Sequence, residues 1–559
     1  MPRAKGERTV ERMVRRLSSS TARAVMESWR CAAAVAVAVA CVPWAAGAQA
    51  PRTSAARSDA ALAQRIQSIV ERPEFRHSTW GVEFYSLDSG KTVYSLNGDK
   101  LFVPGSTTKL LTMGSALGLL GADYRFHTRV YRTGPITSDG TLDGDLVLVA
   151  SGDANLSGRV QKDGTLAFEN EDHSYDGSPD TKAVPGDPLL VIRDIAAQVR
   201  ARGIRKISGR VLVDATLFPE GERELGTGVV ISPIIVNDNL VDVVITPGAG
   251  PGAPVSLNVS PATPYVRFVN EATTGSADSQ PHIRWSSDLT NPDGSHTVTV
   301  TGTMPVGKQA VLFSYPVPEP SRFAQVALVK ALDGEGVQAA LPPPTEKPDF
   351  EALAAAYTDA NVVAEHVSPP LSEEVKVTLK VSQNLHASAM PYVLGAILAH
   401  DGSPRAGFEK ERDFLQHELG LDISGASQGD GAGGSAHFTP AFMVRFLAAM
   451  AERKDFPSYF AALPVLGRDG TLWNIQTSSP AAGHVHAKTG TYVEDDLLNN
   501  GMIVDGKGLA GYLTTADGRK LAFAIYANNV PVSMDPDAIT KIVGQAVGEV
   551  AAAGYEARP

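Results

Sequence analysis

The stretch Pro104–Thr112, PGSTTKLLT, carries the feature on which the prediction of fold and chemistry depends. Pro104-Gly105 breaks the chain just before apolar residues at helical spacing, so a helix is expected over about 106–120. Ser106 and Lys109 are three residues apart in its first turn and therefore share one face. The lysine amine can then reach the serine hydroxyl. A lysine whose pKa is lowered by burial can act as the base that activates that hydroxyl.

A Ser-x-x-Lys pattern alone is weak evidence, because a helix-capping serine followed by a surface lysine looks the same. This is, however, the only Ser-x-x-Lys in the chain. Its apolar neighbours Phe102-Val103 and Leu110-Leu111 predict that the site is buried rather than exposed.

A second feature, Lys488-Thr489-Gly490-Thr491, is predicted on a strand because apolar and polar residues alternate around it. A strand that offers a lysine, two hydroxyls and no side chain at the glycine suits an extended peptide ending in a carboxylate. The glycine lets the peptide backbone approach closely. An edge strand protected by a lysine would show the same pattern, so this feature is also ambiguous alone.

A third feature is Ser382-Gln383-Asn384, one of three Ser-x-Asn triplets in the chain. It is the only one of the three that lies between the first two features and between helical segments. A serine in such a loop can pass a proton to a leaving amine, and an asparagine can bind a substrate amide.

The order of elements predicts one α+β domain whose sheet is built from both ends of the chain. A helix and a hairpin are expected before residue 104, and three strands and a helix are expected after residue 484. In between, short β-type runs separated by Gly, Pro and Asp turns indicate a β-rich insert. We expect this α+β domain at 51–125 and 362–559, a first insert domain at 126–234 and 313–361, and a nested β-rich insert domain at 235–312.

Residues 1–48 have the features of a secretory signal peptide. Basic residues precede the apolar run CAAAVAVAVACV at 31–42, and Ala46-Gly47-Ala48 is a cleavage sequence. We therefore expect export to the periplasm, the cell envelope or the outside. Two alternatives remain open: a true start at Met13 or Met26, and a lipid anchor on Cys41.

Removal of this segment takes away both cysteines, eight Lys/Arg and three Glu, so the net charge changes from −11 to −16. An acidic balance of this size argues against a nucleic-acid partner, and a chain without cysteine has no disulfides. No apolar run in the mature chain is long enough to predict a transmembrane segment. The length of 559 residues, 43% of them hydrophobic, predicts two or three globular domains.

Taken in this order, the three features resemble the motif set of penicillin-binding proteins and β-lactamases. Ser382 lies 276 residues after Ser106, and such a long insert is similar to that of the class C low-molecular-mass penicillin-binding proteins. These are D-alanyl-D-alanine carboxypeptidase/endopeptidases of the penicillin-binding protein 4 type. Further matches include GADYRFHTRV, GRVLVDATLF, VNDNLVDV and HAKTGTY, and they cover nearly the whole mature chain. The resemblance implies the penicillin-recognising fold, with an antiparallel sheet covered by helices on both sides.

The resemblance also implies a serine DD-peptidase that acts on peptidoglycan stem peptides. It would cleave D-Ala-D-Ala termini, D-Ala cross-links or both through an acyl-enzyme, with β-lactam antibiotics as covalent inhibitors. In this family scheme Ser106 attacks the peptide bond and Lys109 is the general base. Ser382 and Lys488 together relay the proton to the departing amine.

The same scheme assigns substrate-binding roles. Asn384 would hold the amide on the acyl side, and Thr489 and Thr491 would hold the terminal carboxylate beside Gly490. The backbone N–H groups of Ser106 and Thr491 would form the oxyanion hole. Neither a metal nor another cofactor is implied.

The sequence departs from the family at several places. Gln383 stands where Asp is common, and the loop Gly429–Ser435 matches the Asp-Gly-Ser-Gly-Leu-Ser pattern only loosely. The segment 221–236, GERELGTGVVISPIIV, lacks the Trp and Asp that usually read the stem-peptide side chain. Two other functions therefore remain open: a serine β-lactamase or esterase of the same fold, and a non-catalytic cell-wall-binding protein.

Overall fold

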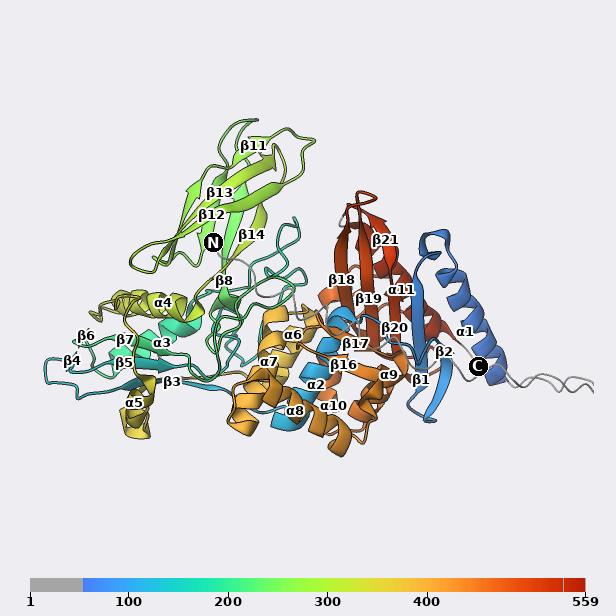
Figure 1. The fold of residues 1–559 in the computed structure, drawn as a ribbon, viewed down its shortest axis with the longest axis horizontal. Helices are drawn as coiled ribbons and strands as arrows, with labels where there is room; N and C mark the ends of the chain where they lie inside the picture. The colour runs from blue at the N-terminus through green and yellow to red at the C-terminus, as the bar shows by residue number, and fades with distance from the viewer. Residues whose placement is uncertain (1–53, 536, 558–559) are drawn as a thin grey trace, which may run out of the picture. The chain divides into compact units, whose positions relative to one another are not determined.

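The structure is a computed structural model that describes residues 54–535 and 537–557 (Figure 1). The expected signal peptide at 1–48, with its alternative starts and Cys41, lies outside the described residues. Across the described ranges, every helix is too short or too polar to pass through a bilayer.

The central element is a six-stranded antiparallel sheet in the order β18-β19-β20-β1-β2, with β21 paired to β19. Figure 1 shows the first two strands (blue) beside strands from the end of the chain (red), as the sequence predicts. The strands are β1 (Thr79–Ser86), β2 (Lys91–Leu96), β18 (Val485–Asp496), β19 (Gly501–Thr514), β20 (Lys520–Asn528) and β21 (Val530–Ser533).

Helices cover both faces of this sheet, because side chains along its inner strands point alternately to either side. On β20, Phe523 and Ile525 pack with α1 (Ser54–Val70) and α11 (Gln545–Glu556). Ala524 and Tyr526 pack into the core of the opposite face. The helices of that face are α2 (Thr108–Leu120), α6 (Leu371–Lys380), α7 (Asn384–Ala399) and α9 (Pro440–Ala451). This arrangement confirms the predicted fold class.

Several smaller elements of this part were not predicted from the sequence. They are α8 (Pro404–Asp413), α10 (Phe456–Ala461), the paired strands β16 (Ala426–Gln428) and β17 (Ala436–Phe438), and β21, a fourth strand where three were expected after residue 484.

The insert contains more helix than the sequence analysis expected. A mixed sheet in the order β15-β3-β5-β7 packs with α3 (Leu190–Ala201) and α4 (Pro320–Gly334) in one core. Its strands are β3 (His127–Arg132), β5 (Leu146–Val149), β7 (Val211–Asp214) and β15 (Val362–Val367), with β4 (Thr141–Leu142), β6 (Lys206–Ile207) and α5 (Phe350–Leu353) nearby in the chain. The expected boundary at 362 assigns β15 to the peptidase domain, although its partner in this sheet is β3.

The remaining strands form two further sheets that share a small apolar core. One sheet contains β8 (Leu240–Thr246), β9 (Ser256–Ser260) and β14 (Val311–Pro316). The other contains β10 (Val266–Asn270), β11 (Thr273–Gly275), β12 (His282–Thr290) and β13 (His296–Pro305). Six of these seven strands lie wholly within residues 235–312, the segment predicted as a nested β-rich insert, and β14 extends beyond it.

Candidate active site

The nucleophile candidate lies in a tight turn at the start of α2. Residues Gly105–Thr107 form a single 3₁₀ turn, and the hydroxyls of Thr107 and Thr108 close it by donating to the carbonyls of Pro104 and Gly105. Gly105 has φ +52°, a left-handed conformation that favours glycine. The turn leaves Ser106 half-buried, and it places Lys109 one helical turn later with no exposed surface.

The strand that carries Lys488 lies directly against this turn. A Cβ added at Gly490 would stand 2.0 Å from the carbonyl oxygen of Pro104, and one at Gly105 would stand 2.5 Å from the amide nitrogen of Thr491. Both glycines are therefore required, because the 104–107 turn and strand β18 pack too closely for a side chain at either position. The sequence analysis explained Gly490 by the approach of a ligand backbone instead.

The Ser382–Asn384 turn connects α6 to α7 and completes the site. Ser382 adopts φ +64°, which is uncommon for serine. Its hydroxyl oxygen accepts a hydrogen bond from Lys488 Nζ at 2.8 Å and lies 3.4 Å from Lys109 Nζ. Asn384 Oδ1 accepts from Lys109 Nζ at 2.6 Å. The structure thus brings together the three features that the sequence analysis selected.

Lys109 is at the centre of the cluster. Its Nζ lies 2.7 Å from Ser106 Oγ, and it also reaches Asn384 Oδ1 and, at 3.3 Å, the carbonyl oxygen of Ala432. A neutral amine has two N–H donors and one lone pair. The two carbonyl-type acceptors can take both N–H groups, which leaves the lone pair for the serine hydroxyl.

Burial controls the charge of the lysines. It lowers the pKa of Lys109 to about 7, and the carboxylates of Glu224 and Asp430 oppose this effect only in part. Burial lowers the pKa of Lys488 well below its usual range, and the neighbouring Lys109 and Lys507 lower it further. A lysine that is neutral near pH 7 can accept a proton from serine, which an ordinary lysine cannot.

Thr489 and Thr491 lie next to Lys488 on β18. Thr489 Oγ1 donates to Thr471 Oγ1 at 2.8 Å, and Thr491 Oγ1, on an exposed residue, accepts from Lys507 Nζ at 2.7 Å. Lys507 lies directly opposite Thr491 in the register of β18 and β19, and burial lowers its pKa to about 8. Sequence reasoning missed Lys507, because only the register of this hairpin reveals the pairing.

Two loops hold the site from outside, and the sequence analysis did not select their anchoring residues. The carboxylate of Asp430 accepts from the backbone N–H groups of Ala432 and Gly433 at 2.7 and 2.6 Å, and this holds the Ala432 carbonyl toward Lys109. Glu224 accepts from the N–H of Gly226 at 2.7 Å. A Cβ at Gly226 would stand 2.1 Å from Asn384 Nδ2, so the segment noted for its lack of Trp and Asp contacts the site.

Tyr175 was also missed, and it comes from the insert. Its hydroxyl lies 2.5 Å from the carbonyl oxygen of Ser382 and 3.1 Å from Asn384 Oδ1. No local pattern in the sequence marks this tyrosine, because its partners lie more than 200 residues further along the chain.

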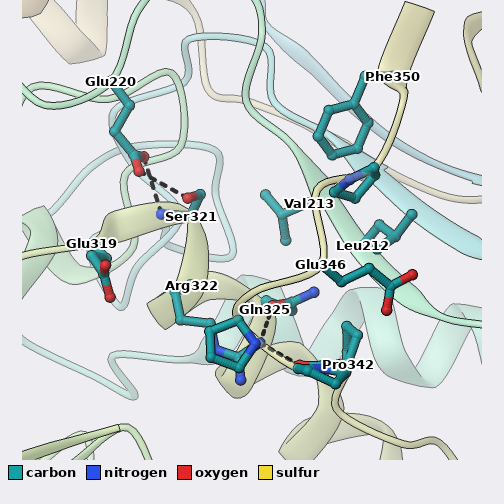
Figure 2. A pocket seen from close by; sticks show the side chains of 13 residues that line it. Leu212, Val213, Glu220, Glu319, Ser321, Arg322, Gln325, Pro342, Glu346 and Phe350 are labelled. Atoms are coloured by element: carbon teal, nitrogen blue, oxygen red, sulfur yellow. Dashed lines mark hydrogen bonds between the residues drawn. The ribbon is translucent and has the colours of Figure 1, made fainter. Parts of the chain in front are cut away.

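A separate cavity of about 270 Å³ lies in the insert, between α4 and the Pro-rich segment 342–348 (Figure 2). Glu220 lines it and accepts from both the N–H and the hydroxyl of Ser321, at 3.1 and 2.8 Å. None of the predicted site residues lines this cavity, so its residues have no direct part in the chemistry described above.

The comparisons with known proteins agree with this geometry. A family model described as the D-Ala-D-Ala carboxypeptidase 3 (S13) family matches residues 62–548. A D-alanyl-D-alanine carboxypeptidase from an Actinomadura species is 29% identical over 492 residues, which cover 84% of this chain and 81% of that protein. A penicillin-sensitive carboxypeptidase A from Dictyostelium discoideum is 24% identical over 484 residues, covering 81% and 83%.

Among solved structures, penicillin binding protein 4 from Haemophilus influenzae superimposes with a TM-score of 0.67 at 20% identity. The match covers 88% of this chain and 99% of that one, and it confirms the fold. The family match spans most of the chain, from the first sheet-covering helix to the last. The chain therefore belongs to the D-Ala-D-Ala carboxypeptidase 3 (S13) family and is a serine DD-peptidase with the fold of a penicillin-binding protein.

Proposed function

We propose that Ser106 is the nucleophile with which this DD-peptidase cleaves D-Ala-D-Ala termini or D-Ala cross-links of peptidoglycan stem peptides. Lys109 Nζ takes the proton of the hydroxyl while Oγ forms a bond to the carbonyl carbon of the penultimate D-alanine. The C–N bond then breaks, which leaves an acyl-enzyme on Ser106 and a departing amine. Water subsequently hydrolyses the ester and returns the serine.

The departing amine needs a proton, and Ser382 with Lys488 is the proposed source. Lys109 Nζ, Ser382 Oγ and Lys488 Nζ are linked by distances of 3.4 and 2.8 Å. A proton taken from Ser106 can therefore move through the Ser382 hydroxyl toward the amine without passing through bulk water. The 2.7 Å contact between Lys109 Nζ and Ser106 Oγ is the observation that carries the proposal.

Substrate binding is assigned to the remaining residues. Asn384 holds the acyl-side amide, and Thr489 and Thr491 hold the terminal carboxylate on either side of Gly490. The N–H groups of Ser106 and Thr491 stabilise the oxyanion, an interaction that typically contributes several kcal/mol to transition-state stabilisation. Penicillins acylate the same serine, and the penicillin-sensitive name of one relative supports this part of the proposal.

The experiment is D-alanine release from a synthetic pentapeptide, measured alongside the hydrolysis of a penicillin. We expect D-alanine release by wild type, its loss in Ser106→Ala, and slow turnover of the penicillin. Rapid penicillin hydrolysis without D-alanine release would show a β-lactamase instead. Absence of both activities would favour a cell-wall-binding protein.

Two further parts of the proposal concern the whole chain. Residues 1–48 direct export to the periplasm or cell envelope, where the substrate lies, and N-terminal sequencing of the secreted protein tests this. We also propose a peptidase domain at 51–125 and 362–559 with two inserts, at 126–234 with 313–361 and at 235–312, although the pairing of β15 with β3 places the strand after residue 362 in the sheet of the first insert. Limited proteolysis that cuts first near these boundaries would support the division.

A further inference from the structure

Asp238 is a buried carboxylate of the insert that contacts the peptidase part of the chain. It is 1% exposed and lies in the segment between β7 and β8. On the insert side, its Oδ2 accepts from Arg159 Nη2 at 2.6 Å and lies 2.8 Å from His173 Nε2. On the peptidase side, its oxygens meet Gln383 Nε2 at 3.2 Å and His386 Nε2 at 2.9 Å.

The backbone around Asp238 is held in an unusual conformation. Asn237, Asp238 and Asn239 have φ of +50°, +54° and +54°, so three consecutive residues are left-handed. This conformation costs roughly 1–2 kcal/mol per residue, less for Asn and Asp, whose side chains bond locally. Both asparagines make such bonds: Asn237 Nδ2 donates to the Leu240 carbonyl, and Asn239 Oδ1 accepts from the Val236 N–H. Strain of this kind persists where the surroundings fix it, and it often occurs near functional sites.

The two peptidase-side partners of Asp238 flank the residues that the proposed mechanism uses. Gln383 lies between Ser382 and Asn384, and its Oε1 accepts from the Leu385 N–H at 3.0 Å, which caps the start of α7. The Gln383 side chain thus connects Asp238 to the helix that begins with Asn384. His386 lies in the first turn of the same helix, and Glu374 Oε1 lies 3.1 Å from its other ring nitrogen.

The carboxylates around Asp238 are paired with basic side chains of the protein. The carboxylates of Glu374 and Asp238 raise the pKa of His386 to about 10, although burial opposes this, so the imidazole is protonated. Arg159 donates to Asp172 as well as to Asp238, and His173 also contacts Asp242. Oxygen and nitrogen ligand atoms of Asp172, His173 and Asp238 lie within 4.8 Å of one another. The guanidinium in contact with both carboxylates supplies the positive charge there, so we read the group as an ion-pair network.

We propose that Asp238 is a positioning residue for the peptidase reaction, through which the insert sets the geometry of the Ser382–Asn384 turn. By binding Gln383 and His386, Asp238 keeps Ser382 Oγ within hydrogen-bond distance of Lys488 Nζ, and Asn384 Oδ1 within hydrogen-bond distance of Lys109 Nζ. The inference rests on the proposed function, because it gives Ser382 and Asn384 the roles stated there. It assigns the insert a part in catalysis beyond that of a spacer.

The test compares Asp238→Asn with Asp242→Asn in the full chain. Both substitutions neutralise a buried carboxylate on His173, but Asp242 has no contact with the 382–386 segment. A fluorescent penicillin counts the active sites, so that rates are expressed per folded site. We expect Asp238→Asn to lower the rate constant for acylation at least about tenfold, and kcat for the pentapeptide similarly, with KM changed less than about threefold. Asp242→Asn should have a lower Tm than wild type but keep both rates within about twofold of the wild-type values.

Equal rates per site in Asp238→Asn and wild type would overturn the inference, as would equal losses in both variants. If Asp238→Asn does not fold, Gln383→Met replaces it, because methionine fills the same space without either hydrogen bond. An unchanged acylation rate in Gln383→Met would then refute the positioning role, and a drop of several-fold with KM preserved would support it. A wild-type chain that forms no penicillin adduct and releases no D-alanine would refute the proposed function, and the inference with it.

Discussion

The acylation rate should depend on pH through Lys109. Its pKa of about 7, against 10.5 for an ordinary lysine, means that about half of the molecules carry the neutral base at pH 7. With an unshifted pKa, about one in 3,000 would. Only the neutral amine can take the Ser106 proton, and burial disfavours the charged form. The rate should therefore rise about tenfold per pH unit below 7 and level off above about 8.

The assay is stopped-flow acylation by a fluorescent penicillin between pH 5 and 9, normalised to the number of sites titrated at each pH. Near-UV circular dichroism checks that the fold is unchanged over this range. Lys109→Arg is the control, because arginine keeps its charge at every pH in the series. It should acylate very slowly and without the acid limb. An acid limb centred above pH 9, or a flat profile between pH 5 and 8, would refute the reasoning about Lys109.

Three other substitutions test the site. Gly490→Ala puts a Cβ 2.0 Å from a backbone carbonyl, so acylation should fall at least about a hundredfold or Tm should fall by several degrees. Gly250→Ala is the control, because open space surrounds Gly250, and it should change neither the acylation rate nor Tm. Wild-type values of both in Gly490→Ala would contradict the close packing. Lys507→Met removes the ammonium group that donates to Thr491 Oγ1. KM for a substrate that ends in a free carboxylate should therefore rise several-fold more than KM for the same substrate with its carboxylate converted to an amide. Equal changes in the two KM values would exclude carboxylate recognition. Tyr175→Phe removes one hydroxyl worth about 1 kcal/mol, so kcat should fall about fivefold, and a wild-type kcat would show that this contact is dispensable.

The sheet and its motifs were predictable because their signals are local. The short apolar run at 521–527 and the Asp517-Gly518 turn before it are local signals, and they predict β20 and its hairpin closely. The Pro104-Gly105 break and the helical spacing after it similarly predicted α2. In the insert, α3 has apolar residues at helical spacing, among them Val191, Ile195 and Val199. The surrounding strand-like runs outweighed this signal, so the helix was missed.

The remaining site residues were not predictable, because their roles arise from contacts between distant segments. Tyr175 and Asp238 lie in the insert, and each contacts the Ser382–Asn384 turn, which follows more than 140 residues later in the sequence. Asp430 was seen only as part of a loosely matching loop, because its function depends on how its carboxylate meets backbone N–H groups. Such contacts depend on the path of the chain through the insert, which composition and periodicity do not specify.

The central claim is that Ser106 forms the acyl-enzyme. Its most direct test is intact-mass analysis after incubation with penicillin, followed by peptide mapping, for wild type and Ser106→Ala. We expect one adduct of the mass of the penicillin per wild-type chain, located on the peptide that contains Ser106, and none on Ser106→Ala. An adduct that persists on Ser106→Ala, or one that maps to another residue in wild type, would contradict the account.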